Sequence, residues 1–356
     1  MNEFENFVTI SKLIGERFDL IQSAGGNISY KIDDKLFIKS SGFALSDIDA
    51  NNGFSILNYK LINEGLKNHY LDDKEICNNK MNEILLSSLQ NNYNLPSMET
   101  YFHSFLDIIT IHTHPISVNL ITTKENFEEV LNDLFPKSLV IKYCTPGLPL
   151  SIEIYKKYNK NTNIIFLQNH GLIVTSNDYE NAIILQENII NTIDKYLDIN
   201  HYKYKISNYF SQSFNRYFNN NFICYLCDDF ISLENDIIIK NYKPFLPDLL
   251  VFCGFEILFC NNIEELEIQY KEYFTKYKSF PSILYHKMYI YIFASTKRKA
   301  KDIEEVFRSY IFLANNQKGI NYLNQNKTID VFLKDVKSLI NGFTFNFLKK
   351  FSPIVF

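Results

Sequence analysis

Histidines separated by a single residue constrain the fold of this chain more than any other feature of its sequence. His112 and His114 stand in the run Ile-His-Thr-His-Pro, and His170 stands in Gln-Asn-His-Gly, although the chain has only 7 histidines. On a β-strand, residues i and i+2 point to the same face, so a strand here presents two imidazoles side by side. His170 follows a second apolar run, residues 163–167. If the two strands are neighbours in one sheet, three imidazoles converge.

Three converging neutral imidazoles are typical of a catalytic metal site, because they leave one coordination position open. The sequence therefore makes His112, His114 and His170 candidate ligands of a divalent metal, with zinc favoured. A His-x-His on its own is more commonly a pair of core or turn histidines. The metal hypothesis consequently depends on what else the N-terminal half contains.

The composition excludes several classes of partner. With 36 basic and 40 acidic residues the net charge is −4, so no global basic field favours nucleic acid or an anionic membrane. No apolar stretch reaches the roughly 18 residues of a membrane span, and the N-terminus lacks a signal-peptide pattern. We expect a cytoplasmic protein whose six cysteines are free thiols. Cys224 and Cys227 form a Cys-x-x-Cys without a second pair at zinc-ribbon spacing, so we expect no metal there.

The hydrophobic pattern predicts helices and strands in two domains, residues 1–210 and 222–356, with a polar and aromatic connecting region around 198–221. In the first domain we expect a hairpin of strands 28–32 and 35–39, and a capping box of Asn177 and Glu180 that begins a helix. The first domain also contains further predicted strands, at 108–112, 139–143, 163–167 and 172–174.

The second domain repeats a pattern of the first. Residues 164–174 and 177–197 predict a strand, a short turn and a helix, and residues 283–293 and 297–314 predict the same order. His286 even falls near the place of His170. A degenerate internal repeat is one interpretation. In that case the second copy has kept the scaffold and lost the metal, because no His-x-His precedes it.

Other polar residues of the N-terminal half stand at predicted turns. Gly25-Gly26-Asn27, Ser41-Gly42 and Ser97 place main-chain N–H groups and polar side chains where an anion such as phosphate can bind. Lys39 could add a positive charge. Glu99 precedes His112 by 13 residues and is a candidate general acid/base. Taken singly, such residues are more commonly ordinary turn or helix-start residues.

Taken together, the ordered motifs Gly-Gly-Asn-Ile-Ser, Ser-Gly, Pro-Ser-x-Glu-Thr-x-x-His, His-Thr-His-Pro and Asn-His-Gly resemble the class II aldolase/adducin family. The most similar subgroup is that of the long aldolases like rhamnulose-1-phosphate aldolase. The motifs span residues 25–171, and the resemblance covers 1–210 closely and 222–345 loosely. It implies a three-layer α/β/α domain around a mixed, largely antiparallel sheet, followed by a smaller C-terminal α/β domain.

The resemblance implies a metal-dependent lyase that cleaves or forms a C–C bond in a sugar phosphate or related hydroxyketone. The reaction would pass through an enediolate that the metal stabilises. A homo-oligomer, commonly a tetramer, acting on a small carbohydrate is also implied. The roles implied for individual residues are metal binding, most commonly of zinc, by His112, His114 and His170, acid/base catalysis by Glu99, and phosphate binding by Asn27, Ser41, Gly42 and Ser97, with Lys39 as an added charge.

Two departures from the family pattern limit these expectations. Met98 stands where simple sugar-phosphate aldolases often carry a second hydroxyl residue, which leaves the phosphorylation state of the substrate open. Members of the long subgroup often carry a short-chain dehydrogenase module after this domain. Residues 222–356 contain no Gly-x-Gly-x-x-Gly, so we do not expect that module or its NAD site here.

Two alternatives to an aldolase remain open. A decarboxylase or an epimerase would use the same metal chemistry. A non-catalytic interaction protein like the adducin head is the second alternative, and it predicts a decayed metal site.

Overall fold

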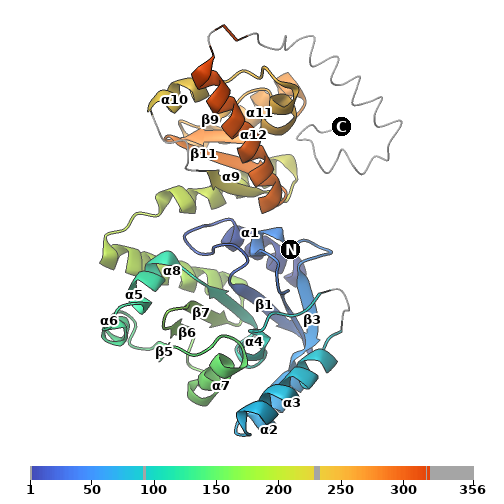
Figure 1. Ribbon diagram of the computed structural model, residues 1–356, viewed down its shortest axis with the longest axis vertical. Coiled ribbons are helices and arrows are strands. Elements are labelled where there is room, and N and C mark those ends of the chain that lie inside the picture. The colour runs from blue at the N-terminus through green and yellow to red at the C-terminus, as the bar shows by residue number, and fades with distance from the viewer. Residues whose placement is uncertain (1, 91–93, 228–232, 318, 321–356) are drawn as a thin grey trace. The chain divides into compact units, whose positions relative to one another are not determined.

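The computed structural model describes residues 2–90, 94–227, 233–317 and 319–320. The chain divides into two compact units, Met1–His201 and Tyr202–Phe356. Each unit has its own sheet and its own buried hydrophobic clusters, and each is therefore described by itself (Figure 1).

The first unit is built on a seven-stranded sheet with the order β3-β2-β1-β4-β7-β6-β5. Its pairings are antiparallel except for that of β5 with β6, which is parallel. The predicted mixed, largely antiparallel sheet is thus confirmed. The strands are β1 (Asn27–Ile32), β2 (Lys35–Lys39), β3 (Phe54–Asn58), β4 (Ile109–Thr113), β5 (Leu139–Ile141), β6 (Ile164–Leu167) and β7 (Gly171–Ser176).

Helices cover both faces of this sheet, which gives the predicted three layers (Figure 1). Alternate strand residues supply the two faces: Ile111 packs with one group of helices, while Ile173 packs on the opposite side. The first face carries α1 (Glu3–Gly15), α5 (Ile116–Thr122), α6 (Phe127–Leu134) and α8 (Tyr179–Leu197). The second face carries α2 (Tyr59–His69), α3 (Lys74–Ser87), α4 (Thr100–Phe105) and α7 (Leu148–Lys157).

Strand β4 lies at the centre of the sheet, and all five of its residues are buried. Its register with β1 places Asn27 opposite His112, and its register with β7 places His112 opposite Ile173. Three strands from distant parts of the sequence therefore meet at His112.

The second unit is a smaller α/β unit with a four-stranded sheet in the order β8-β11-β10-β9. One hydrophobic cluster fills each face of this sheet. Its strands are β8 (Ile223–Cys227), β9 (Leu258–Phe259), β10 (Ile283–His286) and β11 (Tyr289–Ala294). Its helices are α9 (Tyr202–Phe218), α10 (Leu233–Lys240), the π-helix η2 (Leu249–Cys253), α11 (Leu266–Tyr277) and α12 (Lys297–Asn316).

The second sheet repeats the connectivity of half of the first. In the first unit β4 is followed by helices, then β5, a helix, the hairpin β6–β7 and α8, with the spatial order β4-β7-β6-β5. In the second unit β8, β9, the hairpin β10–β11 and α12 follow the same plan, with the order β8-β11-β10-β9. Both edge strands, β5 and β9, pair in parallel with the hairpin. His286 is not at the place of His170, since it ends β10 rather than lying in the hairpin turn.

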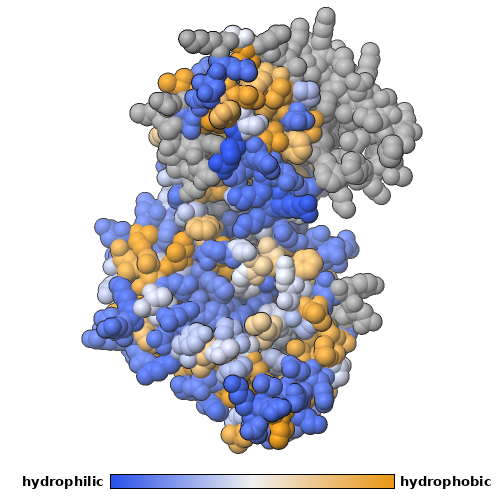
Figure 2. All heavy atoms as spheres, in the orientation of Figure 1, coloured by the Kyte–Doolittle hydropathy of each residue, from blue (hydrophilic) through white to orange (hydrophobic). Residues whose placement is uncertain are grey.

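Hydrophilic residues cover much of the surface that Figure 2 shows, with hydrophobic ones in small groups between them. Exposed large side chains include Leu71 and Met98, which are 74% and 63% exposed. Within the described parts of the chain, every helix is too short or too polar to cross a membrane.

The region expected to connect the domains is largely helical. Residues 202–218 form α9, and its Phe210 and Phe214 are completely buried in the second unit. The Phe214 ring stacks on Phe293 of β11, with 4.2 Å between the ring centroids. The sequence of this helix is rich in Asn, Ser and Tyr, so its helical pattern is hard to recognise. A narrow stripe of apolar residues is enough to hold the helix against a sheet.

We expect Phe214→Ala to lower the free energy of unfolding of the second unit by about 3–5 kcal/mol, because it leaves a large cavity in a closed core. Urea unfolding followed by tyrosine fluorescence would measure the effect. Gln212→Ala, on the exposed side of the same helix, is the control and should change stability by less than about 0.5 kcal/mol. Equal effects of the two substitutions would show that α9 is not part of this core.

Candidate metal centre

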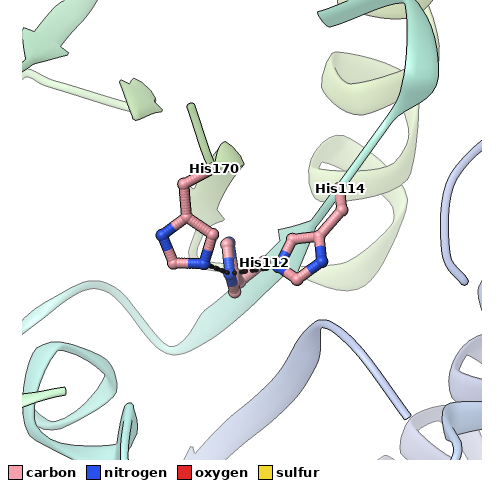
Figure 3. Close-up of side chains that lie close together, drawn as sticks. All are labelled: His112, His114 and His170. Atoms are coloured by element: carbon pink, nitrogen blue, oxygen red, sulfur yellow. Dashed lines mark hydrogen bonds between the residues drawn. The ribbon is translucent and has the colours of Figure 1, made fainter. Parts of the chain in front are cut away.

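Three imidazoles of the first unit point toward one another, as Figure 3 shows. His112 lies in β4, His114 follows that strand directly, and His170 lies in the turn between β6 and β7. Nε2 of His112 is 3.1 Å from Nε2 of His114 and 3.3 Å from Nε2 of His170. Within the described residues these three form a group whose donor atoms could hold one metal ion. The structure thus brings together the three histidines that the sequence singled out.

The ring of His112 is oriented by the neighbouring strand. Its Nδ1 lies 3.0 Å from the main-chain oxygen of Leu172 in β7, and a carbonyl oxygen can only accept a hydrogen bond. Nδ1 therefore carries a proton, and in the neutral ring the lone pair of Nε2 faces the other two imidazoles. A main-chain carbonyl in this position commonly fixes the tautomer of a metal-binding histidine.

The spacing of the nitrogens fits a metal ion. Ligand atoms of a tetrahedral site with bonds of about 2.0–2.1 Å stand about 3.3–3.4 Å apart, close to the two separations measured from His112. Three imidazoles are a donor set that suits zinc and other late divalent metals. The residues present therefore fit a divalent cation in both geometry and chemistry.

Glu99 lies beside this cluster. It is the N-cap residue of α4, is 7% exposed, and directs Oε1 to within 3.5 Å of Nε2 of His112 and 3.3 Å of Nε2 of His170. Burial alone would raise the pKa of this carboxyl, but the charges and hydrogen bonds of His112 and His170 hold the pKa well below its usual range. Glu99 is therefore ionised at neutral pH. Its second oxygen, Oε2, accepts a hydrogen bond from Asn27 over 2.6 Å.

The other residues expected to bind phosphate lie on loops beside the imidazole cluster. An isolated bridge pairs Ser40 with Pro96, and the main-chain N–H of Ser41 donates to Leu95. This pairing brings the Ser41-Gly42 loop next to the loop of Ser97. The Ser97 hydroxyl accepts a hydrogen bond from the N–H of Glu99 at 3.2 Å. Ser97 therefore supports the start of α4, where the candidate catalytic residue Glu99 lies.

Lys39 ties these loops to the turn before β1. Its buried ammonium donates to the main-chain oxygens of Ala24 at 3.0 Å and Phe43 at 2.8 Å, with Ser40 at 3.5 Å. Burial lowers the pKa of Lys39 to about 8, while the charge of Glu99 acts in the opposite sense. Lys39 therefore acts here as a cross-link between two loops, and its charge lies beneath them.

The glycines of the Gly-Gly-Asn motif make room for the histidines. A Cβ atom on Gly25 would lie 2.9 Å from Nδ1 of His114, and one on Gly26 would lie 2.7 Å from the main-chain oxygen of His112. Gly26 also has a φ of +65°, which disfavours other residues. Gly171, after the third histidine, is equally restricted, since its Cβ would lie 2.3 Å from the oxygen of Thr113.

Sequence reasoning missed a buried ion pair that holds the main chain of His114. The guanidinium of Arg17 contacts the Asp19 carboxylate at 2.6 Å and 3.1 Å. The main-chain oxygens of Asp19 and Leu20 accept from the N–H groups of Ile116 and His114, each at 3.0 Å. The sequence offered only an Arg-x-Asp spacing as a signal, which is too common to single out.

A fourth histidine of the first unit was also given no role. His103 is completely buried, and its Nδ1 lies 2.6 Å from the Ser29 hydroxyl. Its ring stacks on Phe102, which in turn meets the His112 ring edge-on. Burial, together with the charge of His112, lowers the pKa of His103 well below its usual value, so the ring is neutral at neutral pH.

A family model matches more than half of the chain. Residues 5–197 match the model of the class II aldolase and adducin N-terminal domain. Similar solved structures include the N-terminal class II aldolase domain of a conserved protein from Thermoplasma acidophilum, with 26% identity, a TM-score of 0.49, and coverage of 55% of this chain and 94% of that one. A sugar-phosphate aldolase from Thermotoga maritima has 15% identity and a TM-score of 0.41, with coverage of 55% of this chain and 94% of that one. A candidate aldolase, epimerase or decarboxylase from Klebsiella pneumoniae has 16% identity and a TM-score of 0.40, with coverage of 56% of this chain and 91% of that one. No curated protein matches the chain.

We expect Gly25→Ala to weaken metal binding on the order of 10–100-fold, the range seen when the support of a metal ligand is disturbed. The new methyl group would displace the His114 ring, although the chain would still carry all three histidines. Zinc titration against a competing chelator would measure the affinity. Ala24→Gly, which alters the same turn without adding an atom near His114, should keep the affinity of the original chain. If Gly25→Ala binds zinc equally well, close packing against His114 is not required.

The buried neutral His103 predicts a loss of stability in mild acid. Below the unfolded pKa of about 6.5, the unfolded chain takes up a proton that the folded state excludes, so stability present above this pH is lost as pH falls. His103 would contribute up to about 1.4 kcal/mol per pH unit. Urea unfolding of the metal-free protein between pH 7.5 and 5 would show this slope. His103→Gln should have a shallower slope, and an unchanged one would contradict the assignment.

Proposed function

The chain belongs to the class II aldolase and adducin family, and from this premise we propose that it is a metal-dependent carbon–carbon lyase. Its substrate would be a sugar phosphate or a related hydroxyketone, and the activity would reside in the first unit. The metal would be a divalent cation, with zinc favoured, held by His112, His114 and His170. We further propose a cytoplasmic homo-oligomer, with a tetramer favoured.

One observation carries this proposal: a buried, ionised carboxylate lies beside the place where the Nε2 atoms of three imidazoles converge. Glu99 Oε1 is 3.3 Å from His170 and 3.5 Å from His112. A structural zinc site has no need of a free carboxylate, whereas a catalytic site needs a base within reach of a bound substrate.

The residues of this chain divide the chemical work. A divalent cation bound by the histidines would supply a Lewis acid that stabilises negative charge on substrate oxygens. In the condensation direction, Oε1 of Glu99 would remove a proton from the carbon beside the substrate carbonyl. In the cleavage direction the same oxygen would return a proton to that carbon. Burial of Glu99 excludes bulk water from this transfer.

Three residues on the adjoining loops would hold a phosphate group, with the charge of Lys39 beneath them. We assign this role to Ser41, Gly42 and Ser97, because Lys39 and the bridge of Ser40 with Pro96 join their loops into one surface. Gly42 has a φ of +79° and open space around its Cα, so its main chain is accessible. Anchoring of a phosphate would fix the position of the substrate carbons relative to Glu99.

Metal content and turnover of matched variants test the proposal. We expect about one divalent ion per chain in the untagged protein, cleavage of a ketose phosphate from a panel of such sugars, and loss of both in His112→Ala. Glu99→Gln should keep the metal and lower turnover on the order of 10²–10⁴-fold. The control is His69→Ala, which removes a partly exposed histidine bound to Asp72 and should change neither quantity.

Other outcomes would assign the protein differently. Release of carbon dioxide or inversion of a carbinol centre, without cleavage, would indicate a decarboxylase or an epimerase on the same site. A protein that holds no metal after incubation with zinc, manganese or cobalt would contradict the lyase and favour a non-catalytic role.

A further inference from the structure

His114 is held by a loop, whereas His112 is held by two neighbouring strands. Strand β4 ends at Thr113, and its registers with β1 and β7 do not extend to His114. The N–H of His114 donates instead to the main-chain oxygen of Leu20 over 3.0 Å. The amide nitrogen of Gln22 lies 3.5 Å from the main-chain oxygen of His114. The position of this imidazole therefore depends on how the loop between α1 and β1 is held.

Arg17 holds this loop with its main chain and its side chain together. Its main-chain oxygen accepts from the N–H groups of Leu20 at 3.1 Å and Ile21 at 3.0 Å. Its guanidinium contacts the Asp19 carboxylate through two nitrogens, and the two residues are 3% and 1% exposed. A planar guanidinium paired in this way fixes orientation as well as distance. The oxygen of Leu20 that accepts from His114 therefore lies in a turn of defined geometry.

A second carboxylate joins the loop to a helix that covers the sheet. Nη1 of Arg17 contacts Oε1 of Glu187 in α8. The preceding residue of this helix, Gln186, accepts from the hydroxyl of Thr113 at 3.4 Å. Helix α8 thus contacts β4 at the residue before His114 and also holds the loop that binds His114.

Stability alone does not explain the clamp formed by Arg17, Asp19 and Glu187. Burial removes water from charged groups, and apolar residues of similar volume commonly stabilise a core as well or better. An ion pair does impose one geometry, because the guanidinium fork accepts a carboxylate in few orientations. This geometry sets the two loop oxygens that accept from the N–H groups of His114 and Ile116, each over 3.0 Å. The chemical group that depends on it is the imidazole of His114.

We propose that Arg17 is a positioning residue of the metal site, which acts with Asp19 and Glu187 to set the place of His114. This inference rests on the proposed lyase function and deepens it: affinity for the divalent cation depends on a guanidinium whose hydrogen bonds go to two carboxylates. Without the clamp, the loop and His114 would shift, while the contact of His112 with β7 would remain. The site would then keep a well-placed central imidazole and lose the one that the loop carries.

Zinc affinity of the full chain tests this role. The double variant Arg17→Met/Asp19→Asn removes both buried charges together, so neither is left unpaired. We expect it to bind zinc on the order of 10–100-fold more weakly in competition with a chelator. The visible absorption of bound cobalt(II), which responds to coordination geometry, should change as well. If the double variant fails to fold, Glu187→Gln, at the partly exposed end of the clamp, should weaken zinc binding on the order of tenfold.

The control is Phe7→Leu, a substitution of a completely buried residue of α1. It should lower the stability of the same unit and leave zinc affinity and the cobalt(II) spectrum unchanged. Equal weakening of zinc binding in Phe7→Leu would show that any loss of stability has this effect, and would overturn the proposal.

A double-mutant cycle assigns the effect to His114. In a His114→Ala background, measured with a weaker competing chelator, the added Arg17→Met/Asp19→Asn should change zinc affinity by no more than about twofold, because the imidazole that the clamp positions is already gone. The same loss of affinity in both backgrounds would overturn the proposal, as would original affinity in the clamp variants. An original chain that binds no zinc would instead overturn the proposed function itself.

Discussion

The antiparallel pairing of β4 with both β1 and β7 is the constraint on which the candidate site depends. Because this strand is central and buried, its residues cannot move without breaking two ladders of hydrogen bonds. His112 consequently receives a fixed neighbour on each side, with Asn27 on β1 and the oxygen of Leu172 on β7. The first neighbour orients the carboxylate of Glu99 and the second fixes the proton of the imidazole. The proposed base Glu99 and the proposed metal ligand His112 are thus both held by contacts with these three strands.

Much of the site could be predicted from the sequence, because its chemistry is local. The alternation of a strand places His112 and His114 on one side, and the position of Glu99 at a helix start follows from the Pro-Ser-x-Glu run. What the sequence could not supply was contact across the fold. Gly25 looked like a flexible turn residue, yet its lack of a side chain makes room for the ring of His114. The partner of Asn27 was equally invisible, since 72 residues separate it from Glu99.

The fold shows the same division between local and distant information. The hairpin of β1 and β2 and the central strands appear where alternation predicted them, and the three layers follow from apolar residues on both sheet faces. The helix cap expected at Asn177 was wrong by one residue, because the carboxylate of Asp178 accepts from the N–H of Asn181 and a one-residue shift preserves the apolar stripe of α8. Helix α9 was not predicted, because its burial depends on Phe293 and other residues far along the chain.

The second unit repeats this connectivity, but its described residues do not repeat the three-histidine arrangement of the first unit. Leu226 of β8 pairs with the third residue of β11, as His112 pairs with the third residue of β7, so an apolar side chain takes the place of the central ligand. The hairpin turn is also shorter: residues 287–288 replace the three residues that end with His170, and both have positive φ. A two-residue turn of this kind directly joins the two strands and has no third position to carry an imidazole. The two units share one strand order. A few side chains and one extra turn residue distinguish the unit that could bind a metal in this way.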